Sequence, residues 1–393
     1  MKILIEGDAN PVRALRDAWR EPPTFAYLSA RSGGHEPWVA GIASEIPEPL
    51  REGHFALFSS GSTGEPKLVI GSRRRAENLT RILHEVQASE PVRETIGLLP
   101  LPYSYPFVNQ WLWSETFGRE FVATPGFADP EVVVRTLSAA DDAMVCLVAA
   151  HLPLLERHFG ERSFEGVIRV HFAGGRFPQE RLSEVRRRFP EARIYNNYGC
   201  VEAMPRLCVR PAEDGDTASD IGLPIAGVEL RSSENGELSF RSRFSAVGFC
   251  DATGFHPIDP EAWVSTGDYG HLASSGHWEL DGRANEVFKR YGEKVSLPML
   301  LSSVAVSWSG QAAFYRETDS LGECGHVLVL APPPSRVDLR AILETLRHDY
   351  ARVQWPLRVE SVSLLPLLRN GKPDARSLAQ MTEKRVEWSQ RLS

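Results

Sequence analysis

The sequence lacks the features that mark several protein classes. Only 5 of its 393 residues are cysteines, and no two form a CxxC pair; they are Cys146, Cys200, Cys208, Cys250 and Cys324. Neither a disulfide framework nor a structural zinc site is therefore expected. No run of about 18 apolar residues occurs, so we expect no membrane span. The first residues have no apolar segment after a basic start and do not resemble a signal peptide.

Neither sign of charge dominates the chain. The 44 Lys and Arg against 51 Asp and Glu give a net charge of −7. A mildly acidic chain with interspersed charges is not expected to bind nucleic acid. Hydrophobic residues make up 42% of the sequence, which excludes an intrinsically disordered chain. We expect a cytoplasmic protein of roughly two domains.

Short apolar runs alternate with helical patterns in the first half of the chain. Strands are predicted at 55–58, 95–99, 144–149, 167–172 and 193–195, and helices at 76–86, 130–138 and 179–189. This alternation predicts a large N-terminal α/β domain with a mainly parallel sheet. Two alternating runs at 228–231 and 237–241 predict a β-hairpin in a small β-subdomain. From about residue 285 the pattern restarts as a separate α+β domain.

The segment from Ser59 to Lys67 reads Ser-Ser-Gly-Ser-Thr-Gly-Glu-Pro-Lys. Its hydroxyls, glycines and lysine suit a polyphosphate, although such text alone is also typical of a plain surface loop. It is not a Walker loop, which would need the lysine directly after the second glycine. The whole string resembles the phosphate loop of the adenylate-forming (ANL) superfamily, of the acyl-CoA synthetase or AMP-dependent ligase type.

Further motifs of that superfamily follow in order. The glycine pair after the strand at 167–172 resembles its adenine-binding pair, and residues 196–202 resemble its Tyr-Gly-x-Thr-Glu motif. Residues 265–268 resemble its Thr-Gly-Asp motif, 281–289 its Gly-Arg hinge, and 370–374 its terminal Asn-Gly-Lys. The resemblance implies a large AMP-binding domain at 1–282, a hinge at 283–286 around Asn285, and a mobile C-terminal lid at 287–393.

The resemblance also implies roles for individual residues. Glu202 would hold Mg²⁺, which prefers carboxylate oxygens, and Lys372 would bridge the acyl carboxylate and the α-phosphate during catalysis. The remaining ATP-binding residues would be Ser59, Ser60, Gly61, Ser62, Thr63, Gly64, Lys67, Gly174, Gly175, Asn197, Tyr198, Gly199, Asp268 and Arg283. Taken singly, Asp268 and Lys372 are also typical of exposed turns, and Glu202 of a helix start.

The sequence departs from the family pattern in three places. Val201 stands where the family has threonine, and Asn285 stands at the hinge position usually filled by Asp or Lys. Only about 55 residues precede the phosphate loop, far fewer than in most relatives, so the N-terminal region is expected to be unusually short.

The acid and its acceptor are predicted more broadly. No Asp or Glu lies between Gly97 and Ser114 to bind an α-ammonium group, which disfavours a free amino acid. Tyr103, Asn109 and Trp111 are candidates for an apolar acyl pocket that suits an aryl or medium-size acid, and ordinary helix packing is the alternative. By resemblance, Arg290, Gly292 and Lys294 would line the path of a thiol.

The sequence therefore predicts an ATP-dependent acid–thiol ligase that forms an acyl-adenylate and releases pyrophosphate. Its partners would be ATP with Mg²⁺, a carboxylic acid, and either coenzyme A or the phosphopantetheine of a carrier protein. Two alternatives stay open: a ligase with an amine or protein acceptor, and a non-catalytic nucleotide-binding scaffold.

Overall fold

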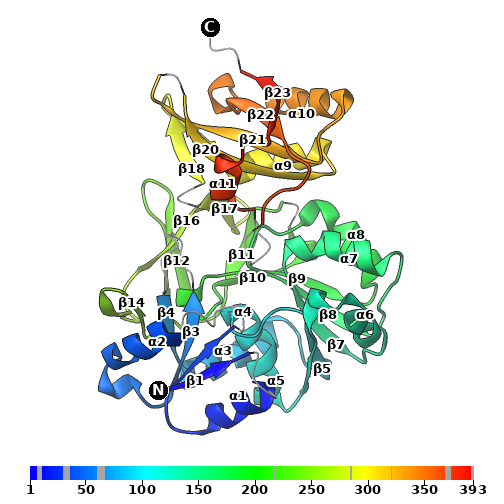
Figure 1. The fold of residues 1–393 in the computed structure, drawn as a ribbon. Coiled ribbons are helices and arrows are strands. Elements are labelled where there is room, and N and C mark those ends of the chain that lie inside the picture. The colour runs from blue at the N-terminus through cyan, green and yellow to red at the C-terminus, as the bar shows by residue number, and fades with distance from the viewer. Residues whose placement is uncertain are drawn as a thin grey trace. The chain divides into compact units, whose positions relative to one another are not determined.

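The computed structural model describes residues 1–6, 11–29, 36–59, 67–215, 217–283, 286–319, 321–367 and 373–390. The chain divides into two compact units (Figure 1). The N-terminal unit contains residues 1–267 and 271–279, and the C-terminal unit contains 268–270 and 280–393. Two long strands, β16 (Val264–Leu272) and β17 (Trp278–Arg283), contribute residues to both units.

A six-stranded sheet carries the residues on either side of the predicted phosphate loop. Its order is β1-β2-β3-β4-β14-β15, with β1 at Lys2–Ile5, β2 at Phe25–Leu28, β3 at His54–Ser59, β4 at Lys67–Ser72, β14 at Gly248–Asp251 and β15 at Gly254–Pro257. Helices α1 (Pro11–Arg20) and α2 (Glu36–Ile42) lie between its first strands in sequence. Strands β3 and β4 are antiparallel, with Ser59 opposite Lys67. The loop therefore begins and ends at the same end of this strand pair.

The parallel core belongs to an eleven-stranded sheet. Its strands β6, β5, β7, β8 and β9 are parallel neighbours, at Glu120–Ala123, Glu94–Gly97, Ala143–Leu147, Val167–Phe172 and Arg193–Tyr198. Between these strands in sequence lie α4 (Ser104–Pro106), η4 (Phe107–Leu112), α5 (Trp113–Phe117), α6 (Pro130–Ser138), α7 (Leu152–Phe159) and α8 (Leu182–Arg188), while α3 (Arg73–Val86) precedes β5. Every residue of β7 is buried, which explains its unbroken apolar run.

The same sheet continues with antiparallel strands. They are β10 (Cys208–Pro211), β11 (Asp220–Pro224), β17, β16, β13 (Glu237–Ser242) and β12 (Val228–Ser232). Strands β12 and β13 form the hairpin that the sequence predicts, with Val228 opposite Ser242. Gly236 in its turn has a φ of 88°, a conformation that glycine adopts without steric cost.

The described residues of the C-terminal unit form two small sheets and three α-helices. Strands β18 (Val287–Arg290) and β19 (Glu293–Ser296) form one hairpin, and the other sheet has the order β20-β21-β22-β23. These four strands lie at Gln311–Thr318, Cys324–Ala331, Arg358–Ser361 and Arg385–Ser389, and the helices are α9 (Leu297–Ser307), α10 (Arg336–Asp349) and α11 (Ala375–Gln380). Ser335 and Asp338 form a reciprocal cap at the start of α10, which satisfies two otherwise unpaired backbone donors.

The predicted fold class is confirmed: a large α/β unit with a β-subdomain is followed by a small α+β unit. The exact domain boundary, the hinge and the motion of the small domain stay predictions, because Asn285 lies outside the described residues. No described helix is long and apolar enough to cross a membrane.

A buried ion pair stabilises the C-terminal unit. Arg290 Nη2 lies 3.0 Å from Asp319 Oδ2, and the two side chains are 1% and 0% exposed. Arg290 also donates to the carbonyls of Val353 and Trp355. Burial alone would raise the pKa of Asp319, but hydrogen bonds from Arg290 and Tyr291 outweigh it and lower the pKa from 3.8 to about 2. The carboxylate is therefore held ionised.

We expect Asp319→Asn to lower the thermal stability of the C-terminal unit, because it leaves the Arg290 charge buried without a carboxylate. The pKa of Asp319 is lower in the folded state than its usual value of 3.8. The stability that its ionised form provides is therefore complete above pH 3.8 and is lost as the pH falls toward about 2. The melting temperatures of wild type and variant, measured by calorimetry, should therefore converge as the pH falls through that interval. Arg340→Met, which removes an exposed pair with Glu344, should change little. A gap between Asp319→Asn and wild type that persists at low pH would contradict this assignment.

Candidate functional site

The carboxyl ends of two parallel strands carry the predicted glycine pair and the Tyr198 loop. Gly174 and Gly175 follow β8, and Gly174 has a φ of 75°. Strand register places Phe172 of β8 opposite Asn196 of β9, so the glycine pair and the Tyr198 loop begin at neighbouring strand ends. This edge of an open α/β sheet is where ligands commonly bind.

The loop after β9 holds its shape through a close backbone contact. A Cβ atom on Gly199 would lie 1.8 Å from the Pro205 carbonyl oxygen, so only glycine fits there. Glu202 follows in a short helical turn at Val201–Ala203, and its carbonyl accepts a hydrogen bond from the Ala246 amide. No described residue pairs with the Glu202 carboxylate. That free oxygen donor fits the predicted magnesium role, and Mg²⁺ typically takes one or two carboxylates together with substrate phosphates.

Asn197 has contacts that the motif did not indicate. Its Oδ1 accepts a hydrogen bond from Gln87 Nε2 at 2.9 Å, and its Nδ2 donates to the Phe172 carbonyl at 3.2 Å. The side chain is 3% exposed. These bonds hold β9 to its neighbours beneath the loop, and the predicted contact of Asn197 with nucleotide stays a prediction.

Asp268 and Arg283 lie together within the C-terminal unit. Asp268 is 5% exposed and its Oδ1 lies 3.2 Å from Arg283 Nε. Gly267, immediately before it, has a φ of 71°, which explains the glycine of the Thr-Gly-Asp motif. The Asp268 carboxylate thus lies beside the Arg283 guanidinium, and a carboxylate suits a pair of ribose hydroxyl donors.

Several predicted residues lie outside the described part of the chain. These are Ser60, Gly61, Ser62, Thr63, Gly64, Asn285 and Lys372, together with the side chain of Ser59. Lys67 is described, and its ammonium lies 4.7 Å from the centre of the Phe249 ring. Leu367 and Pro373, on either side of the Lys372 segment, form an antiparallel bridge.

The predicted acyl-pocket residues have different surroundings. Tyr103 is 43% exposed, whereas Trp111 is fully buried against Trp19 at a ring separation of 5.5 Å. The alternative of ordinary helix packing therefore describes Trp111 better, because its ring packs against the rings of Trp19 and Phe107. Asn109 is also buried, and its Oδ1 accepts a hydrogen bond from Arg206 Nη2 at 3.0 Å.

Arg206 was not among the residues that the sequence singled out. The only signal available was an arginine inside the otherwise apolar stretch at 203–209. Periodicity gives such a residue no special weight, because a single arginine on a strand end usually reaches solvent.

The predicted thiol path requires one correction. Arg290 is buried and paired with Asp319, so its guanidinium is not available to bind a thiol substrate. Lys294 Nζ lies 2.8 Å from Asp281 Oδ2. Gly292 has a φ of 85° and open space where a Cβ would stand, which leaves its backbone accessible.

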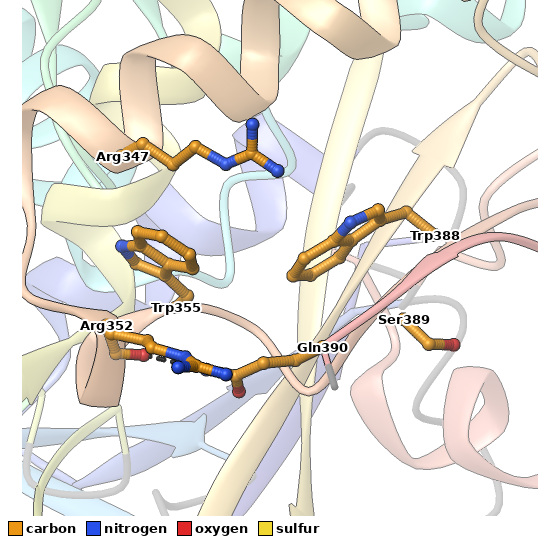
Figure 2. Close-up of a pocket in the computed structure, with 6 residues that line it drawn as sticks. All are labelled: Arg347, Arg352, Trp355, Trp388, Ser389 and Gln390. Atoms are coloured by element: carbon orange, nitrogen blue, oxygen red, sulfur yellow. Dashed lines mark hydrogen bonds between the residues drawn. The ribbon is translucent and has the colours of Figure 1, made fainter. Parts of the chain in front are cut away.

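A cavity of about 650 Å³ lies in the C-terminal unit. Its lining residue Trp355 is hydrogen-bonded through its carbonyl to Arg290 of the β18–β19 hairpin. Figure 2 shows the indoles of Trp355 and Trp388 on opposite sides of it, with Arg347 above. Its described lining includes no acid and consists of Arg347, Arg352, Trp355, Trp388, Ser389 and Gln390. Gln390 Nε2 donates to the Arg352 carbonyl at 2.9 Å, while its Oε1 is buried and has no partner among the residues that the structure describes. The cavity suits a ligand that combines a planar ring with negative charge.

Comparisons with known proteins agree with the motifs. A 3-[(3aS,4S,7aS)-7a-methyl-1,5-dioxo-octahydro-1H-inden-4-yl]propanoyl:CoA ligase of Mycobacterium tuberculosis is 31% identical over 187 residues, which are 46% of this chain and only 36% of that protein. A D-alanine–D-alanyl carrier protein ligase of Streptococcus pneumoniae is 23% identical over 391 residues, covering 89% of this chain and 75% of its own length.

Solved structures share the fold. The o-succinylbenzoate CoA synthetase of Bacillus subtilis, in complex with its acyl-adenylate intermediate, aligns with a TM-score of 0.77 at 17% identity, over 98% of this chain and 88% of that one. The same synthetase is also known with ATP and a magnesium ion. Residues 11–238 match the family model described as AMP-binding enzyme, which is more than half of the chain. The chain therefore belongs to the AMP-binding enzyme family within the adenylate-forming superfamily.

Proposed function

We propose that the protein is an ATP-dependent ligase that activates a carboxylic acid as its acyl-adenylate and transfers the acyl group to a thiol. The observation that carries this proposal is the Tyr198–Glu202 loop at the carboxyl ends of the parallel strands. There a glycine-constrained turn carries the Glu202 carboxylate, which pairs with no described residue, beside a glycine pair. A scaffold that had lost its chemistry would have no need of that carboxylate.

The first half-reaction joins two anions. A carboxylate oxygen of the acid attacks the α-phosphorus of ATP, the bond to the β-phosphate oxygen breaks, and pyrophosphate leaves. Mg²⁺ held by Glu202 would neutralise the phosphates. Lys67 and the loop before it would bind the leaving group, Asp268 would accept from the ribose hydroxyls, and Lys372 would lie between the reacting carboxylate and the α-phosphate.

The acid we propose is not a free amino acid. The described residues of the aromatic segment at 103–113 include no acid to bind an α-ammonium group. The guanidinium of Arg206 beside Asn109 would repel such a group. An aryl or medium-size acid remains the proposed substrate class.

The proposed acceptor is coenzyme A. Its adenine ring and phosphates match the indoles and arginines of the cavity in Figure 2. Arg290 bonds to the Trp355 carbonyl, and Gln354 Nε2 donates to the Lys294 carbonyl at 2.7 Å. Hydrogen bonds therefore connect the cavity to the β18–β19 hairpin, which carries the predicted thiol path. In the second half-reaction the thiol sulfur attacks the acyl carbon, AMP leaves, and the thiol proton passes to solvent.

We expect Asp268→Ala to weaken ATP binding. Losing a charge-assisted hydrogen bond to the ribose should cost about 10- to 150-fold in affinity, which calorimetric titration would measure. Asp281→Ala is the matched control, because it removes another carboxylate with a cationic partner, Lys294. Equal affinity in wild type and Asp268→Ala would place the ribose elsewhere.

Lys372→Ala should separate the two half-reactions. Removing a preorganised cation commonly costs about 10²- to 10³-fold in rate, so acyl-adenylate formation should fall by that factor while nucleotide affinity stays near normal. Thioester formation from synthetic acyl-adenylate and thiol should be spared. Equal loss in both half-reactions would contradict the assigned role, and unchanged rates in both would remove Lys372 from the mechanism.

Arg347→Ala should raise the KM for coenzyme A by about 10-fold, the effect of one charged hydrogen bond. Pyrophosphate exchange, which needs no thiol, should not change. Arg340→Ala is the control, because it removes an exposed arginine from the same helix that does not line this cavity. Acylation of a carrier protein with no acylation of coenzyme A would overturn this acceptor, and acylation of an amine alone would favour the other ligase class.

A further inference from the structure

Arg206 is a buried cation whose partners are almost all missing. Its residue is 1% exposed, and it follows the Glu202 turn just before β10. Its one hydrogen bond to a described residue runs from Nη2 to Asn109 Oδ1 at 3.0 Å. Its Nε is buried and has no hydrogen-bond partner among the described residues. A guanidinium carries five N–H donors, so this one is far from satisfied.

The other buried arginines of the N-terminal unit are treated differently. Arg210, on the same strand β10, lies 3.7 Å from Asp220 Oδ1 and donates to Gln179 Oε1 at 3.1 Å. Arg73 and Arg169 each donate to three or more backbone carbonyls. Arg206 makes no ion pair with any described residue and donates no hydrogen bond to a described backbone carbonyl. Arg210, Arg73 and Arg169 therefore each have several acceptors within the fold, whereas Arg206 has one among the described residues.

The groups around Arg206 are neutral. The ring of Tyr105 lies 5.4 Å from its guanidinium carbon. Burial raises the pKa of the nearby Cys146 thiol to about 12 and lowers that of His171 well below its usual range, so both are uncharged at neutral pH. Burial also lowers the pKa of Arg206, to about 10, which still leaves it charged. The cation thus has no described counter-charge.

A second unpaired group lies at the same strand ends. The Nε2 of His171 is buried and has no hydrogen-bond partner in the described part of the chain, while its Nδ1 lies 3.4 Å from Asn197 Nδ2. His171 belongs to β8 and stands opposite Cys146 of β7. Tyr105 donates to the His171 carbonyl at 2.8 Å. The two unsatisfied side chains therefore belong to one cluster, built from β7, β8 and the aromatic segment predicted to meet the acid.

We propose that Arg206 binds a second anionic group on the acid substrate, so that the enzyme activates one carboxylate of a dicarboxylic acid. This inference rests on the proposed function. Bidentate contact of a carboxylate with the guanidinium would supply the missing counter-charge and acceptors. An uncharged acid would leave Arg206 buried and unpaired, and the site would reject it for that reason.

The test compares diacids with matched acids that lack the second charge. Adipate, suberate, phthalate and terephthalate are each paired with their monomethyl esters, which keep the length and lose one carboxylate. Pyrophosphate exchange gives kcat/KM for each acid, and calorimetry in the presence of a non-hydrolysable ATP analogue gives binding without catalysis. The variants are Arg206→Met, which keeps the bulk and removes the charge, and Arg210→Met as the structural control.

We expect wild type to prefer at least one diacid over its monoester by about 10- to 150-fold, the effect of one charge-assisted bond. Arg206→Met should lose that preference, so that its kcat/KM values for the diacid and for the monoester become nearly equal. It should also melt no lower than wild type, because an apolar side chain replaces an uncompensated buried charge. Arg210→Met should melt at a lower temperature than wild type and keep the wild-type preference for the diacid.

Two results would overturn the inference. If no diacid in the panel is preferred or bound more tightly than its monoester, Arg206 does not read a second charge. If Arg206→Met loses ATP affinity and all acids equally, the guanidinium serves the nucleotide or the fold. Failure of the proposed function is a different result: pyrophosphate exchange would be absent with every acid, while calorimetry would still report diacid binding that depends on Arg206.

Discussion

The contact between Gly199 and the Pro205 carbonyl controls the geometry of the candidate site. With 1.8 Å between that oxygen and the place of a Cβ, the chain can turn back there only at glycine. The turn returns the backbone from β9 to β10, where Tyr198 pairs with Cys208. Between these two residues it carries Glu202 and Arg206. One short loop thus carries the Glu202 carboxylate, which pairs with no described residue, and the Arg206 guanidinium, which has one hydrogen bond to a described residue.

Two buried arginines illustrate how differently the same charge is treated. Arg290 has a carboxylate, two carbonyls and low exposure, and it therefore acts as a structural element that anchors the β18–β19 hairpin. Arg206 is equally buried but has one amide oxygen. Desolvating a cation is costly unless partners compensate, so a fold gains nothing from the second arrangement. The cost is understandable where a substrate supplies the missing partner.

Local patterns predicted the elements whose burial is local. Strand β8 and helix α6 occupy the predicted residues, because an apolar run between turn residues and a helical apolar face suffice to define them. The pairing of β14 with β4 was not predictable in this way, because it joins Phe249 to Val69 across a long stretch of chain. The role of Arg290 was misjudged for the same reason: its partner Asp319 comes from a different element.

The candidate site divides along a similar line. Its nucleotide part could be predicted from the sequence, because binding the same nucleotide requires glycines and carboxylates at the same spacing in each member of the family. The acid part has no such constant demand. The residues we propose for it come from separate elements and meet only after folding; they are Tyr105, Asn109, His171 and Arg206. Only burial and hydrogen-bond accounting in the folded chain distinguish an arginine that stabilises the protein from one that awaits a ligand.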